Sequence, residues 1–97
     1  HLMPTTQFRF TTAENGLPFA YNANSTWEVK TPSGSSGATT AAATGGQNLC
    51  RVATDTAVYV TFAASPTATS TTGFLVPANG VEYFRVKTGD KAAVITI

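Results

Sequence analysis

The chain has 97 residues, a length that accommodates one domain with a single hydrophobic core. Hydrophobic residues make up 42% of it, which excludes a disordered or membrane-embedded chain, but charged residues make up only 11%, against roughly 25% in a typical globular domain. The net charge of +1 comes from scattered basic residues and does not indicate a nucleic-acid-binding patch. Thr, Ala, Ser and Gly take the place of charge, and such a surface is easily desolvated, which favours contact with another protein.

The first two residues, His1 and Leu2, precede Met3 and have the look of a tag remnant, so we expect one domain over residues 3–97. No apolar stretch approaches the ~18 residues of a membrane-spanning helix. No basic segment followed by an apolar one opens the chain, so we expect no secretory signal and no membrane partner.

Residues 5–12 alternate in character, with Phe8 and Phe10 on one side, and predict a half-buried strand. A turn is expected at residues 13–16. The apolar segment that follows contains a proline, which indicates an edge strand or an irregular arm. On the surface its apolar side chains would serve as contact anchors: Leu17, Phe19 and Tyr21.

Residues 26–30 alternate again and predict a strand with Trp27 and Val29 facing inward. We interpret Trp27 as a packing residue in preference to a platform for a ligand. Residues 31–46 contain no charge and no large side chain. Their first half predicts a flexible loop, and residues 38–44 a weak strand or a mobile loop, poorly ordered unless a partner packs on them.

The second half of the chain predicts consecutive strands over residues 49–53, 57–63 and 74–76. In the middle one, Val58, Val60 and Phe62 share a face. A polar loop covers residues 64–73, and the turn at residues 77–80 contains an Asn-Gly pair.

Two further strands complete the pattern. Residues 81–86 have mixed faces, and we expect the strand to bury one face fully and to cover part of the other. Residues 91–97 form an apolar strand that we expect to be held in a sheet, with Ala93, Ile95 and Ile97 facing inward.

Seven or eight short strands without a helical period predict an all-β fold, either an antiparallel β-sandwich or a small barrel. Few charges protect the edge strands, so self-association would cover them.

Residues for catalysis are sparse. Cys50 lies in an apolar run and predicts a small buried hydrophobe, and the one histidine is His1, so a catalytic thiol or a Ser-His-Asp triad lacks its base. The five acids are dispersed, without the spacing of a metal site or of a glycosidase pair. We therefore expect no enzyme activity, no metal and no cofactor.

The second half of the chain, residues 48–97, resembles small structural proteins of tailed bacteriophages. The motifs that carry this resemblance are LCRVA at residues 49–53, AVYVTF at 57–62, SPTAT at 65–69, and LVPANGVEYF at 75–84 with a following Gly-Asp turn. The chain departs from the family pattern at Ala63-Ala64, where glycine is frequent, and at Asn79, which is inserted in the Pro-Ala-Gly turn.

The resemblance implies a β-sandwich or jelly-roll subunit of the virion, made in the bacterial cytoplasm, and in particular a capsid decoration (cement) protein. Its partners would be the major capsid protein or other virion proteins, with no nucleic acid, and it would form a homo-oligomer, a dimer or a trimer. Besides the arm, the contact candidates are in the polar loop: Pro66, Thr67 and Thr69. The alternatives are a head–tail joining or tail component, and a receptor- or glycan-binding β-module, which would expose aromatic side chains around Trp27, Tyr21 or Tyr59.

Overall fold

The computed structural model describes residues 4–12 and 25–97, and the regular structure in this part of the chain is entirely β. The all-β prediction is therefore confirmed. Eight strands follow in order: β1 (Thr6–Thr11), β2 (Thr26–Lys30), β3 (Gly37–Ala42), β4 (Leu49–Thr54), β5 (Val58–Ala63), β6 (Phe74–Val76), β7 (Gly80–Arg85) and β8 (Lys91–Thr96).

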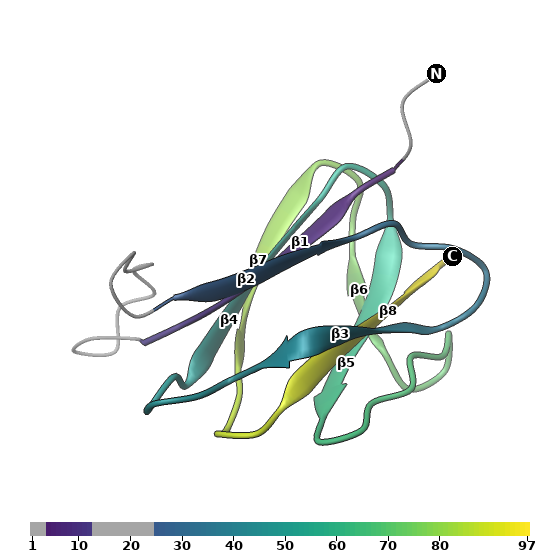
Figure 1. Ribbon diagram of the computed structural model, residues 1–97. Coiled ribbons are helices and arrows are strands. Elements are labelled where there is room, and N and C mark those ends of the chain that lie inside the picture. Colours follow the sequence, from purple (N-terminus) through teal and green to yellow (C-terminus); the bar gives the residue numbers. More distant parts are fainter. Residues whose placement is uncertain (1–3, 13–24) are drawn as a thin grey trace.

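The strands form two separate antiparallel sheets that lie one over the other (Figure 1). The first sheet has the order β2-β1-β4-β7 and the second sheet the order β3-β8-β5-β6. The chain passes from one sheet to the other at five of the seven connections between these strands, and only the β1–β2 and β5–β6 connections join neighbours in one sheet. This is the double-sheet winding of a jelly roll, so the molecule is a sandwich and the barrel alternative is wrong.

The core lies between the sheets and consists of the inward side chains of both. Phe8 and Phe10 of β1 face Val58 and Val60 of β5, and all four are fully buried. The alternation in β1 therefore predicted its buried side correctly, and in β5 the residues predicted to share a face, Val58 and Val60, are both in the core. Cys50 of β4 is buried with them as a small hydrophobe, as predicted.

The facing of β2 is opposite to the prediction. Trp27 and Val29 are 57% and 54% exposed. Their register partners in β1 are Arg9 and Gln7, whereas Glu28 is opposite the core residue Phe8. Paired residues of an antiparallel ladder point to the same side, so Glu28 faces the second sheet. The reason is a requirement for hydrogen bonds at the edge of β3, described below.

The predicted facing of β8 is also wrong. Its core residues are Ala92 and Val94, while Ile97, predicted to face inward, is 69% exposed. Residues 92–95 are all apolar, so alternation cannot distinguish the two faces of this strand. The expectation that the strand is held in a sheet is confirmed, because β8 lies between β3 and β5.

The strand β7 lies at the edge of the first sheet, and the prediction that it buries one face fully is wrong. Val81 and Tyr83 are 42% and 43% exposed, and Phe84 is only half-buried. The turn before it is as predicted: the Gly80 N–H donates to the Pro77 carbonyl over 3.0 Å, and Asn79 has a φ of 58°. Asparagine tolerates this left-handed conformation better than most residues, so Asn79 can occupy the inserted position in the turn with little strain.

Of the two alternatives for residues 38–44, the strand is confirmed. β3 pairs with β8, with a shift of register between Ala38 and Ala42. Both β8 and the side chain of Glu28 supply hydrogen bonds to β3, so its packing partners come from within the chain.

Candidate binding surfaces

The outward face of the first sheet presents a row of four large side chains. Arg9 of β1 is opposite Trp27 of β2 and Arg51 of β4, and Arg51 is opposite Tyr83 of β7. We call these residues the Arg–aromatic row: Trp27, Arg9, Arg51 and Tyr83. Adjacent strands are about 4.8 Å apart, so the row extends for roughly 14 Å across the sheet.

No acid within residues 4–12 and 25–97 forms an ion pair with either arginine of this row. The Arg9 guanidinium lies 4.8 Å from the centre of the Trp27 ring, a cation–π contact. Among the residues that the structure describes, the only ion pair joins Lys30 and Glu28, on the other side of β2. Arg9 and Arg51 are direct cross-strand neighbours, and like charges in that position repel. The row therefore favours an anionic group placed over it.

An open depression of about 430 Å³ adjoins the row. Its floor is the next row of outward side chains, two residues further along each strand: Val29, Gln7, Ala53 and Val81. Ala53 is small, and the larger side chains of the Arg–aromatic row stand beside it. The far end of the depression is polar and includes Asn79, Thr5 and Asp55. Asp55 accepts a hydrogen bond from the Thr5 N–H over 2.9 Å, so its carboxylate is held at that end.

The outward face of the second sheet has a different character. No Asp, Glu, Lys, Arg or His occurs in residues 56–81, which supply β5, β6 and the loop between them. The loop leaves β5 at Ala63, which is opposite Lys91 at the start of β8. Further along the loop, the Ala68 N–H donates to Ser36 Oγ over 2.8 Å. Ser36 precedes Gly37, which is opposite Val94 in the second half of β8.

The loop therefore runs back over the sheet, which accounts for the burial of Ala93 on the side away from the core. Beside the loop, Leu75 is 55% exposed and is opposite the half-buried Tyr59. We call the loop of residues 64–73 together with Leu75 the uncharged face.

The contact candidates of the polar loop lie on this face. Thr67 is exposed, and Pro66 and Thr69 are half-buried. The Thr69 hydroxyl is 2.6 Å from that of Thr72 and also accepts the Thr72 N–H over 3.1 Å, so it shapes the loop. Leu17, Phe19 and Tyr21 lie outside the described residues.

Sequence reasoning missed several residues of these surfaces. Leu75 was assigned to a short strand without a role, although the uncharged residues around it were a usable signal. Arg9, Arg51 and Tyr83 are far apart in the chain, and only the strand register brings them together.

Three aromatic rings close the side of the sandwich where β6 and β7 are adjacent. The Phe84 ring centre is 5.2 Å from that of Phe62 and 5.4 Å from that of Phe74, both in tilted geometry. Such pairs add about 0.5–1.5 kcal/mol to simple burial. Phe74 remains 58% exposed, so the apolar surface continues around this edge from Leu75.

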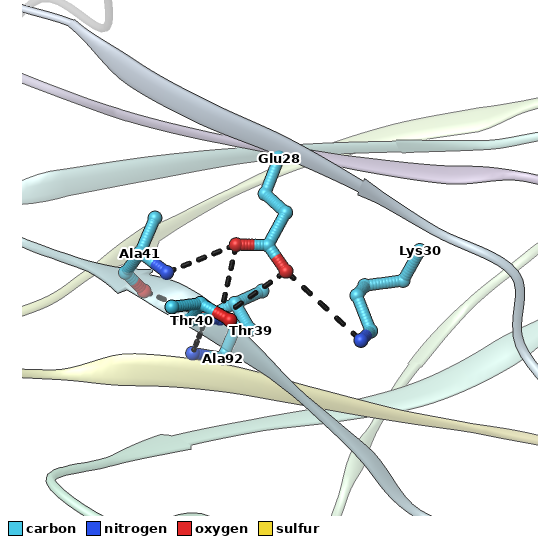
Figure 2. A network of polar contacts seen from close by, with 6 residues as sticks. All are labelled: Glu28, Lys30, Thr39, Thr40, Ala41 and Ala92. Atoms are coloured by element: carbon cyan, nitrogen blue, oxygen red, sulfur yellow. Dashed lines mark hydrogen bonds and ion pairs between the residues drawn. The ribbon is translucent and has the colours of Figure 1, made fainter.

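A polar network closes the opposite side, between the edge strands β2 and β3 (Figure 2). Glu28 Oε1 accepts the N–H groups of Thr40 and Ala41, each over 2.9 Å, and Lys30 Nζ is 4.0 Å from Oε2. Thr39 Oγ1 donates to the Ala41 carbonyl over 2.8 Å and accepts the Ala92 N–H over 3.1 Å, which fills the shift of register in β3. These contacts satisfy an exposed strand edge, and such edges otherwise invite pairing with another chain.

The Cys50 thiol and the acidic side chains were the candidates for reactive or metal-binding groups in the described residues. Burial raises the pKa of the Cys50 thiol to about 12, although a backbone hydrogen bond at Arg9 acts in the opposite direction. A thiol with that pKa is not a nucleophile at neutral pH. No group of three His, Cys, Asp or Glu side chains in residues 4–12 and 25–97 could hold a metal ion. In the same part of the chain no helix is long and apolar enough to cross a membrane.

Comparisons with protein-family models, with curated proteins and with solved structures found no match for this chain. Two outward surfaces of the sandwich remain as candidates for function: the Arg–aromatic row of the first sheet and the uncharged face of the second.

Proposed function

We propose that this domain is a non-enzymatic structural subunit of a bacteriophage virion, a capsid decoration protein that attaches to the shell through the uncharged face. The observation that carries the proposal is the exposure of Leu75 beside an uncharged loop that is held against the sheet. An apolar side chain surrounded by hydroxyls and backbone loses little hydration energy on contact with protein. The motifs that resemble phage structural proteins build the same strands and loop.

The mechanism is one of binding alone. A subunit that binds the assembled shell and not its separated parts stabilises the assembly by mass action. Bridging two neighbouring capsid subunits gives this preference, because the complete binding surface exists only in the shell. Self-association as a dimer or trimer at a symmetry axis would multiply the contacts. The same face would equally serve a head–tail joining or tail position.

The test is addition of the purified protein to shells that lack it, followed by measurement of binding stoichiometry and of the heat resistance of the shells. Leu75→Asp and Thr67→Asp place a charge on the uncharged face and are expected to reduce shell affinity at least tenfold, because the charge must be desolvated on contact. Thr88→Asp adds the same charge in the exposed turn between β7 and β8 and is the matched control. Absence of binding, or equal loss in all three variants, contradicts the proposal.

A specific observation favours a second candidate function, recognition of a glycan. That function predicts an exposed aromatic side chain around Trp27, and Trp27 is 57% exposed in the Arg–aromatic row. This candidate concerns the other face of the sandwich, so it is compatible with attachment through the uncharged face.

A further inference from the structure

We infer that the outward face of the first sheet binds an acidic carbohydrate, with a sugar carboxylate over Arg9 and Arg51 and sugar rings along Trp27 and the adjoining depression. This inference rests on the second candidate function, glycan recognition, and does not depend on shell attachment. The two outward faces belong to different sheets on opposite sides of the sandwich (Figure 1), so one molecule can engage both partners.

The charge of the ligand follows from the two arginines. Arg9 and Arg51 are held side by side by the register of β1 and β4, and no described carboxylate neutralises either. Guanidinium groups match carboxylates in a two-bond, planar geometry. An arriving carboxylate would replace the repulsion between the two cations with two charge-assisted contacts.

The carbohydrate nature of the ligand follows from the groups around the arginines. Trp27 and Tyr83, at the two ends of the row, expose ring surface that suits the apolar faces of sugar rings. The depression adds the side-chain amides of Gln7 and Asn79, which match hydroxyl groups as both donors and acceptors. A few polar groups converging on an open, partly apolar depression are typical of a small-ligand site.

Two other anionic partners fit this face less well. An extended acidic peptide would be recognised mainly by backbone hydrogen bonds, but β1 and β4 already pair on both sides, so the centre of this face offers only side chains. A nucleic acid requires a wider basic surface, whereas Asp55 lies at the end of the depression and the net charge of the chain is only +1.

The test is a binding titration of the purified domain with oligogalacturonate, a chain of acidic sugars, by calorimetry or tryptophan fluorescence. The matched ligand control is the methyl-esterified form of the same oligosaccharide, which keeps the rings and lacks the carboxylates. We expect binding of the acidic form that weakens with added salt, quenching or enhancement of Trp27 fluorescence, and at least tenfold weaker binding of the esterified form.

Three variants distinguish the parts of the inference. Arg51→Gln and Trp27→Ala are each expected to weaken binding about tenfold or more, since both side chains contact the ligand. Lys87→Gln removes the same charge from an exposed position between β7 and β8 and is expected to bind like the unchanged protein. Far-ultraviolet circular dichroism checks that each variant is folded, and neither Arg51 nor Trp27 is part of the core.

Several results would overturn the inference. One is equal binding of the acidic and the esterified oligosaccharide. A second is an affinity for polyglutamate or single-stranded DNA as high as that for the sugar, with no effect of Trp27→Ala, which would indicate general anion binding. A third is absence of binding to oligogalacturonate and also to sialylated and sulfated oligosaccharides. Failure of shell attachment in the Leu75→Asp variant leaves this titration unaffected, so the two proposals fail separately.

Discussion

Removal of the Glu28 carboxylate is expected to weaken the sandwich at the side where β2 and β3 are adjacent. In the Glu28→Ala variant the N–H groups of Thr40 and Ala41 lose the acceptor that now holds them at 2.9 Å. Hydrogen bonds to a charged group contribute about 1.5–3 kcal/mol each. Glu28 is 24% exposed and Thr40 is at the surface, so water can replace part of this contribution.

We therefore expect Glu28→Ala to lower the free energy of unfolding by about 2 kcal/mol. For a domain of this size the midpoint of thermal unfolding would fall by roughly 10 °C. Urea unfolding followed by circular dichroism measures the first quantity, and calorimetry the second. Size-exclusion chromatography would also show association, because the freed edge of β3 can pair with another chain.

Two control variants separate the contribution of the acceptor from that of the ion pair. Glu28→Gln keeps an oxygen that can accept both N–H groups, and we expect it to lose about half as much stability as the alanine variant. Lys30→Gln removes only the partly exposed cation at 4.0 Å and should change stability by less than about 0.5 kcal/mol. The reasoning is refuted if Glu28→Ala costs no more than Lys30→Gln, or if the glutamine and alanine variants are equally unstable.

Two further predictions concern the buried thiol and the glycine positions. Cys50, with a pKa of about 12 against an ordinary 9.0, should resist Ellman's reagent in the folded protein at pH 8 and react on unfolding. Between those two pKa values the folded state binds more protons than the unfolded state, so the free energy of unfolding should fall as the pH rises from about 9. This component of the fall should be absent in the Cys50→Val variant. An equal fall in both proteins would contradict the prediction. Gly73→Ala should lower stability by about 1–3 kcal/mol, because its Cβ would meet the Tyr59 Cβ at 2.8 Å, whereas Gly34→Ala, with nothing within 4 Å, should be tolerated in the same urea titration.

The existence of the strands could be predicted from local pattern, because β-branched and aromatic runs separated by turn residues leave few alternatives. The turn at Asn79 was predictable for the same reason, since asparagine and glycine accept its backbone geometry. The side of a strand that points into the core was predictable only where one side is clearly more apolar, as with Phe8 and Phe10 of β1.

The side that points into the core was not predictable where contacts with another strand determine it. In β2, hydrophobicity alone places Trp27 inside, but Glu28 takes the inward position because it bonds with a strand of the other sheet. In β8 both sides are apolar, so no local signal exists. The candidate surfaces depend on register between distant segments, and for that reason the pairing of Arg9 with Arg51 could not be predicted from spacing in the chain.

The position of β8 between β3 and β5 has a consequence for how the protein is made. As the chain leaves the ribosome, β3 has no strand to pair with until β8, some fifty residues later, has been synthesised. Contacts between such distant segments slow folding. An unpaired segment rich in Val and Ile would readily aggregate. The sequence of β3 is GATTAA, and its small side chains offer little apolar surface for contact with another nascent chain. The strand with the smallest side chains is thus the one whose pairing partner is synthesised last relative to it.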